Sequence, residues 1–191
     1  MENKIWVEDS GRGKQFIYVY VQHEEDRTKV LHLGPWCFDR HVLLEKVKEE
    51  IHPSKISLSK VVFWIRVYGL PFLCLSEKVG KIVGNSIGEV EDIEVVMGRR
   101  ENNQYIRVRV GIDARQPLRR GIKFHIGNSD NIWLSFQYEK LPNFCHACGN
   151  LGHIMNDCKT MNKGQEEWKE EDFQYGPWLR ANNLCFGNYS P

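Results

Sequence analysis

The feature of this sequence that most restricts its fold is a run of fourteen residues, CHACGNLGHIMNDC, at positions 145–158. It contains three cysteines and one histidine with the spacing CX2CX4HX4C: Cys145, Cys148, His153 and Cys158. Three thiolates and one imidazole form a tetrahedral ligand set that suits zinc. Because so short a segment has no room for a core, metal binding must supply the free energy that orders it. We therefore predict one structural zinc ion, with no coordination position left open for catalysis.

Two glycines lie where such a loop has to turn tightly. Gly149 follows the second cysteine, where backbone amides approach the sulfur, and Gly152 can take a left-handed conformation just before the histidine ligand. The alternatives are chance clustering, a reactive pair at Cys145 and Cys148, and His146 as a rival ligand. Zinc is favoured because four ligands occur at metal spacing, and because ligation by His146 would displace its neighbour Cys145.

The N-terminus and the hydropathy favour a metal over disulfides. Residues 1–15 are polar and contain no apolar stretch of signal-peptide length. No window approaches the roughly 20 apolar residues that cross a bilayer. We therefore expect an intracellular protein without a membrane partner, in the nucleus or the cytoplasm, where its six cysteines stay reduced. Cys37 and Cys74 are interpreted as small core residues, and Cys185 as a tail thiol.

The hydrophobic pattern predicts an α+β fold built on antiparallel sheets. Residues 16–21 and 37–44 are predicted strands, and 24–33 a short helix that Gly34-Pro35 ends. Together they suggest a partial, truncated β-α-β upstream domain at 1–50.

Residues 61–140 predict a second α+β domain, of order β-α-β-β-β-β. Its helix should begin after the N-cap Ser76 and end at Gly88, with Val79, Ile82, Val83 and Ile87 on its apolar face. The expected strands are 61–68, 89–96, 104–112, 121–126 and 132–138, the last two forming a hairpin around Asn128, Ser129 and Asp130. The metal-binding segment at 144–159 follows, and then a polar tail at 160–191, expected to be mobile as far as an aromatic patch at 175–178.

The charges suggest a local basic surface. The formal net charge of +1 excludes a uniformly basic nucleic-acid coat. Between residues 99 and 125, however, eight Lys or Arg side chains face only two acids. We predict phosphate contacts from five of them: Arg107, Arg109, Arg115, Arg119 and Arg120. The alternative is a solvated sheet face whose arginines pair with acids of the preceding strand: Glu89, Glu91, Asp92 and Glu94.

Side chains around the metal ligands are candidates for contact with bases. His146 would lie on one side of a cleft, and Ile154 and Met155 on the other, so that an unstacked base fits between them. Phe144 and Lys159 complete the predicted set. The alternative is that these residues pack the metal-binding segment against the sheet domain.

The segment resembles the CCHC zinc knuckles of retroviral nucleocapsids and retrotransposon Gag-like proteins, which bind single-stranded nucleic acid. The matching residues are Cys145, Cys148, Gly149, Gly152, His153, Ile154 and Cys158. His146 stands where that family usually has an aromatic residue.

A longer resemblance covers residues 12–181. It rests on GPWCFDRHVLLEKV at 34–47, FWIRVYGLP at 63–71, GEVEDIE at 88–94, RVRVGIDARQPLRRGIKF at 107–124, YEKLPNFCHACGNLGH at 138–153 and YGPWLRA at 175–181. These stretches are similar to a plant family with a domain of unknown function before a CX2CX4HX4C knuckle. That family is similar to the first open reading frame of LINE-type retrotransposons and to host genes derived from them. The resemblance implies that only the second half of the upstream domain is present.

No catalytic motif stands out, because the chain has no GXXXXGK[ST] or GXGXXG sequence and no GXSXG elbow between a strand and a helix. We therefore expect no enzyme but a zinc-dependent binding protein for single-stranded RNA or DNA, of retroelement-derived type. The alternative is a protein-interaction or assembly module, with a purely structural zinc and a docking hairpin at Trp133, Phe136 and Tyr138. Self-association is compatible with either hypothesis. An enzyme fragment is a third and weaker hypothesis.

Overall fold

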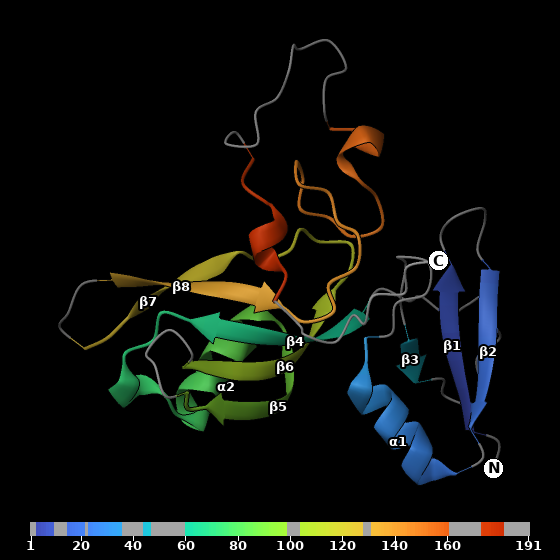
Figure 1. Ribbon diagram of the computed structural model, residues 1–191, viewed down its shortest axis with the longest axis horizontal. Helices are drawn as coiled ribbons and strands as arrows, with labels where there is room; N and C mark the ends of the chain where they lie inside the picture. Colours follow the sequence, from blue (N-terminus) through green and yellow to red (C-terminus); the bar gives the residue numbers. More distant parts are fainter. Residues whose placement is uncertain are drawn as a thin grey trace. The chain divides into compact units, whose positions relative to one another are not determined.

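The computed structural model describes residues 3–9, 15–21, 23–35, 44–46, 60–98, 104–127, 131–160 and 173–181. The N-terminal part contains β1 (Asn3–Asp9), β2 (Gln15–Val21), α1 (Glu24–Leu33) and β3 (Leu44–Lys46) (Figure 1). β1 is the central strand and pairs antiparallel with both neighbours, in the order β2-β1-β3.

Two N-terminal predictions are confirmed and one element was missed. The strand at 16–21 and the helix at 24–33 are present, and the helix ends just before Gly34-Pro35. The missed element is β1, whose apolar residues form too short a run to stand out in a polar segment. It is held by pairing on both sides, with Ile5 opposite Val19 and Lys46. Of the strand expected at 37–44, residues 37–43 lie outside the described residues, as does Cys37.

The second part is a five-stranded antiparallel sheet with one longer helix. It contains β4 (Lys60–Tyr68), η2 (Phe72–Cys74), α2 (Glu77–Ile87), β5 (Glu89–Val96), β6 (Tyr105–Asp113), β7 (Gly121–His125) and β8 (Asn131–Tyr138). The strand order is β5-β6-β4-β8-β7. The α+β class and the predicted element order are confirmed, although the hairpin tip at 128–130 lies outside the described residues. The domain boundaries placed at residues 50 and 61 stay predictions.

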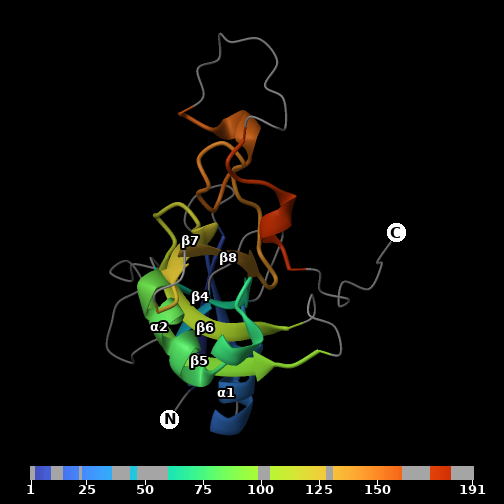
Figure 2. The same cartoon turned by 90° about the vertical axis from the view of Figure 1, so that its left-hand side faces the viewer.

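The core lies on one face of this sheet, where every second residue of the inner strands is buried. The fully buried side chains of β4, β6 and β8 are Phe63, Ile65, Val67, Ile106, Val108, Val110, Leu134, Phe136 and Tyr138. The spacing of two residues is the pleat of a strand with one face inside. Each such side chain contributes roughly 1.5–3 kcal/mol by leaving water. Figure 2 shows α2 covering one side of the sheet.

Helix α2 begins and ends as predicted but buries a different stripe. The hydroxyl of Ser76 accepts a hydrogen bond from the Val79 N–H, at 3.4 Å, and Gly88 ends the helix. The buried residues are Gly80, Val83 and Gly84. Ile82, expected on the apolar face, is 54% exposed. The contact stripe runs through the two glycines, because they allow the helix to approach the sheet closely, and Ile82 then falls on the flank. Among the described residues, no helix is long and apolar enough to cross a membrane.

We expect Gly84→Ala to destabilise the sheet domain. A Cβ at Gly84 would lie 2.6 Å from Cγ2 of Val90, a short side chain with little room to move. Overpacking of this kind costs roughly 1–3 kcal/mol, which outweighs the about 1 kcal/mol that alanine gains over glycine in a helix. Urea denaturation should therefore show a lower unfolding midpoint. Asn85→Ala is the control, because that residue is exposed on the same helix. Equal stability of the two variants would contradict the tight helix-sheet contact.

Candidate metal centre

The first two cysteines are brought together by a tight backbone turn. The Gly149 N–H donates to the Cys145 carbonyl at 2.8 Å, and the Cys145 N–H donates to the Asn150 carbonyl at 2.9 Å. Phe144 and Leu151 close the turn as an antiparallel bridge. Gly149 has φ +78°, a left-handed conformation that was expected from the sequence only at Gly152.

The other two ligands come from the second half of the segment. Gly152, at φ +85°, turns the chain before His153, and its N–H donates to the Asn143 carbonyl at 3.2 Å. The short helix η4 (Met155–Asp157) then carries the chain back, and the Cys158 N–H donates to the Met155 carbonyl at 3.1 Å. The segment therefore presents all four predicted ligands to one point.

The geometry of these four side chains fits one zinc ion. Their ligand atoms all lie within 4.8 Å of one another, and Sγ of Cys148 is 3.4 Å from Nε2 of His153. Zinc-ligand bonds of about 2.3 Å to sulfur and about 2.0 Å to nitrogen place two tetrahedral ligand atoms roughly 3.5–3.8 Å apart. Cys145 and Cys158 are buried, at 0% and 5% exposure. The other cysteine among the described residues, Cys74, lies half-buried in η2, outside this group.

Two of the thiols have strongly different pKa values before a metal binds. Burial raises the pKa of Cys145 to about 11. The Thr160 hydroxyl, 2.9 Å from Sγ of Cys158, lowers the pKa of that thiol to about 6. Since zinc binds thiolates, Cys158 is ready to bind it near neutral pH, whereas Cys145 needs the charge of the metal to lose its proton.

A later part of the chain packs against this turn. The ring of Tyr175 lies directly over Gly149, where a Cβ would collide with its Cε1 and Cζ atoms. The Leu118 N–H donates to the Gly149 carbonyl at 2.9 Å. The turn between the first cysteines is thus contacted by residues far from it in sequence on both sides, a feature that sequence analysis missed.

Residues 173–181 also take a defined course within the predicted tail. Helix η6 (Pro177–Leu179) packs against β8, and Leu179 is fully buried. Arg180 forms a parallel bridge with Tyr138, whose carbonyl accepts the Ala181 N–H at 2.9 Å. The only sequence signal for this packing was the aromatic patch at 175–178. Residues 161–172 and 182–191, with Cys185, lie outside the described residues.

Comparison with known proteins agrees with this geometry. A family model described as a zinc knuckle matches residues 112–160. The chain carries a zinc knuckle. It is also 25% identical, over 169 residues, to a protein of Arabidopsis thaliana named Uncharacterized protein At4g02000. That match covers 82% of this chain and 53% of the relative, so the chain spans about half the length of the relative. No solved structure matches.

The predicted base contacts of the knuckle differ in accessibility. Ile154 is 45% exposed and Lys159 is exposed, whereas His146 and Met155 are half-buried. Phe144 is only 3% exposed, so the structure argues against its direct contact with a base. Its ring lies 4.9 Å from the His146 ring, at 49° to it, and supports the imidazole from within.

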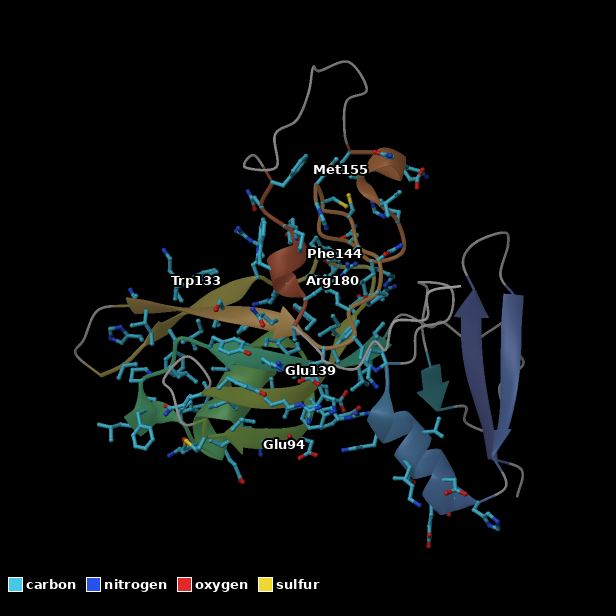
Figure 3. All side chains as sticks on the ribbon, viewed as in Figure 1. Glu94, Trp133, Glu139, Phe144, Met155 and Arg180 are labelled. Carbon is cyan, nitrogen blue, oxygen red and sulfur yellow. The ribbon has the colours of Figure 1, made fainter. Side chains whose placement is uncertain are left out.

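The predicted phosphate contacts on β6 are already paired with acids (Figure 3). Arg107 binds Glu94 at 2.8 Å and Glu139 at 2.7 Å. Arg109 is buried and binds Glu91 at 2.8 Å. The alternative of a sheet face paired with the preceding acidic strand therefore describes both arginines, and the structure argues against their contact with phosphate.

Glu139 ties Arg107 to a neighbouring strand. It also binds Arg66 of β4 at 2.7 Å. Although burial raises the pKa of Glu139, the hydrogen bonds from Arg107 and Arg66 hold it below its ordinary value. The Arg107 guanidinium in turn stacks 3.9 Å from the centre of the Trp64 ring.

The remaining three candidate arginines are exposed. Arg115 donates to both carboxylate oxygens of Asp113, at 2.9 and 2.8 Å, and thereby lowers the pKa of Asp113 to about 2. Arg119 and Arg120 follow directly after Leu118, the residue whose N–H binds the knuckle. A role of these two residues in phosphate contact stays a prediction.

Thr160→Val should make the zinc site more sensitive to acid. Without the hydroxyl, the pKa of Cys158 rises, so protons compete with zinc at a higher pH. Loss of such an outer partner typically weakens metal binding about 10–100-fold. Competition with a zinc chelator across a pH series measures both effects, with Thr160→Ser as the control that keeps the hydroxyl. The interpretation fails if the valine variant and the unmodified protein release zinc at the same pH.

Gly149→Ala should weaken zinc binding more than Gly152→Ala. Both positions have a left-handed backbone, where a Cβ costs roughly 1–2 kcal/mol. Only at Gly149 does the new Cβ also meet a neighbour, the Tyr175 ring, whereas nothing lies within 4 Å at Gly152. The same chelator competition compares the two variants. Adding Tyr175→Ala to Gly149→Ala should recover part of the loss, and the absence of any recovery would argue against the contact.

Proposed function

We propose that this chain is a zinc-dependent binding protein for single-stranded RNA or DNA. The observation that carries the proposal is the zinc knuckle, whose four ligands converge on one point. Zinc knuckles commonly bind nucleic acid. In this role the metal is structural: it orders a loop that could not fold by itself, and the loop then recognises the ligand.

The knuckle offers a small contact for an unpaired base. Ile154 gives an exposed apolar surface, and the ring of His146 is held in place by the buried ring of Phe144. Single-stranded nucleic acids are recognised largely by stacking and apolar contact with bases that are free of a duplex. An imidazole is a smaller platform than the usual aromatic residue, so base contact at the knuckle should be modest by itself.

Phosphate contacts supply the remaining affinity in this proposal. Lys159 is exposed at the end of the knuckle, and Arg119 and Arg120 are exposed before β7. Arg107 and Arg109 are left out of this set, because their charges are balanced by carboxylates. With about three phosphate contacts, the logarithm of the binding constant should fall with the logarithm of the salt concentration with a slope of about −2.

We further infer that the chain is non-catalytic and derives from a retroelement. The four protein ligands leave no position for a metal-bound water, which supports a structural zinc. The inference on origin rests on the resemblance to LINE-type first-reading-frame proteins. The similarity to an Arabidopsis protein supports a plant lineage.

An interaction module is the second candidate, and exposed apolar side chains favour it. Phe72 and Leu73 of η2 are 63% and 94% exposed, and Ile82 of α2 is 54% exposed. The docking hairpin expected from sequence is largely excluded, since Phe136 and Tyr138 are buried and only Trp133 remains on the surface. A pull-down after nuclease treatment separates the candidates, because a protein partner would be retained without nucleic acid.

Binding of fluorescein-labelled 20-mers of uridine and of deoxythymidine to the zinc-loaded full chain tests the proposal. We expect binding that weakens with salt, and that is lost on chelation and in the double variant Cys145→Ser, Cys148→Ser. Cys74→Ser is the matched control, since this cysteine lies outside the metal group. Binding that is independent of salt, or that is unchanged without zinc, would overturn the proposal.

A further inference from the structure

A large indole lies on the surface of β8, away from the knuckle in sequence. Trp133 is 51% exposed, whereas its neighbour Leu134 is fully buried in the core (Figure 3). Because successive side chains of a strand point to opposite faces, Trp133 belongs to the face without the core. Its partner across the β7–β8 ladder is Lys123, which is also exposed.

A glycine leaves room for this indole beside β7. A Cβ at Gly121 would lie 2.6 Å from Cζ2 and 2.7 Å from Cε2 of Trp133, so the ring rests where a side chain would otherwise stand. One side of the indole therefore lies against β7, and about half of the side chain remains exposed to solvent. A flat aromatic ring with one open face is the platform on which an unpaired base stacks.

Basic side chains accompany this ring along the edge of the sheet. The chain before β7 continues along β8, since the Arg120 carbonyl accepts the Phe136 N–H and the Arg119 carbonyl accepts the Tyr138 hydroxyl, both at 2.9 Å. At the spacing of a strand, Arg119 therefore shares the face of Gly121 and Lys123, about 13 Å from Lys123. The indole, which lies against Gly121, is therefore placed between Arg119 and Lys123 along this strand.

The sheet is polarised in charge across its strands. The described residues between 114 and 138 include no acidic side chain. Among all the residues that the structure describes, Arg119 and Lys123 form no ion pair. The opposite edge strand, β5, carries four acids: Glu89, Glu91, Asp92 and Glu94. Two of these acids, Glu91 and Glu94, are paired with arginines of β6, so the basic side chains beside β7 are what favours a polyanion at that edge over the β5 edge.

We propose that Trp133, Lys123 and Arg119 form a second contact site for single-stranded nucleic acid. A base stacks on the outer face of Trp133, and Lys123 and Arg119 contact phosphates on either side of it. This inference rests on the proposed function and adds to it a base platform that the knuckle, with its imidazole at position 146, supplies only weakly. The site is distinct from the knuckle, because none of its residues contributes to the metal group.

Variants of the full zinc-loaded chain, measured by fluorescence anisotropy with the labelled 20-mer of uridine, test the site. Loss of one stacked base should weaken binding about tenfold in Trp133→Ala, and Trp133→Phe should keep most of the affinity. Lys123→Ala should reduce the steepness of the salt dependence by about 0.7. Phe72→Ala and Lys78→Ala are the controls, because they remove an exposed aromatic residue and an exposed lysine from other elements. Both should bind within twofold of the unmodified chain.

The outcomes separate this inference from the proposed function. If the unmodified chain binds and Trp133→Ala binds equally well, the second site is wrong and the function of the knuckle stands. If the unmodified chain does not bind at all, the proposed function falls, and the second site with it. Displacement of the RNA by polyglutamate at an equal charge concentration would show that Trp133 adds no recognition of bases, and would also overturn the site. Circular dichroism and the zinc content confirm that each variant is folded.

Discussion

The folding of the knuckle depends on bringing three thiols and one imidazole to a single point. The backbone prepares this arrangement through two left-handed glycines and a series of short hydrogen bonds. Within 145–158 only Cys145, Gly149 and Cys158 are buried, so apolar burial in this segment cannot offset the entropy lost in ordering the loop. Metal binding supplies the remaining free energy. Because the pKa of Cys158 is lowered and that of Cys145 is raised, Cys158 loses its proton more easily than Cys145. Folding of this segment and zinc binding are therefore one equilibrium.

The position of a strand in the sheet determines whether its basic side chains are paired with acids or remain exposed. Arg107 and Arg109 alternate on β6 with the core residues Ile106, Val108 and Val110. The neighbour of β6 is the acidic strand β5, so these arginines are neutralised and partly buried. β7 pairs only with β8, neither of these strands contains an acidic residue, and Lys123 of β7 remains exposed. The order of the strands therefore shows which arginines are paired with acids, and the local excess of basic residues in the sequence did not.

What could be predicted from the sequence was local. The four metal ligands lie within one short segment, and the strands follow a period of two residues, so both were found. Long-range packing was not accessible in this way. The burial of Phe144, the pairing of Arg107 with Glu139 and the contact of Tyr175 with Gly149 each join residues whose proximity is set by the folded chain. The shift of the buried stripe of α2 away from Ile82 has the same origin, since the sheet selects the glycine side of the helix.

The position of Gly149 bears on where the knuckle begins and ends as a transferable unit. Its carbonyl is bound from upstream by Leu118 and its Cα is covered from downstream by Tyr175, although the ligands themselves span only 145–158. A peptide cut at the outermost cysteines would retain every metal ligand and lose both of these contacts. The metal-binding sequence is therefore shorter than the cooperative structure around it, and grafting the bare motif onto another protein would transfer the chemistry without its support.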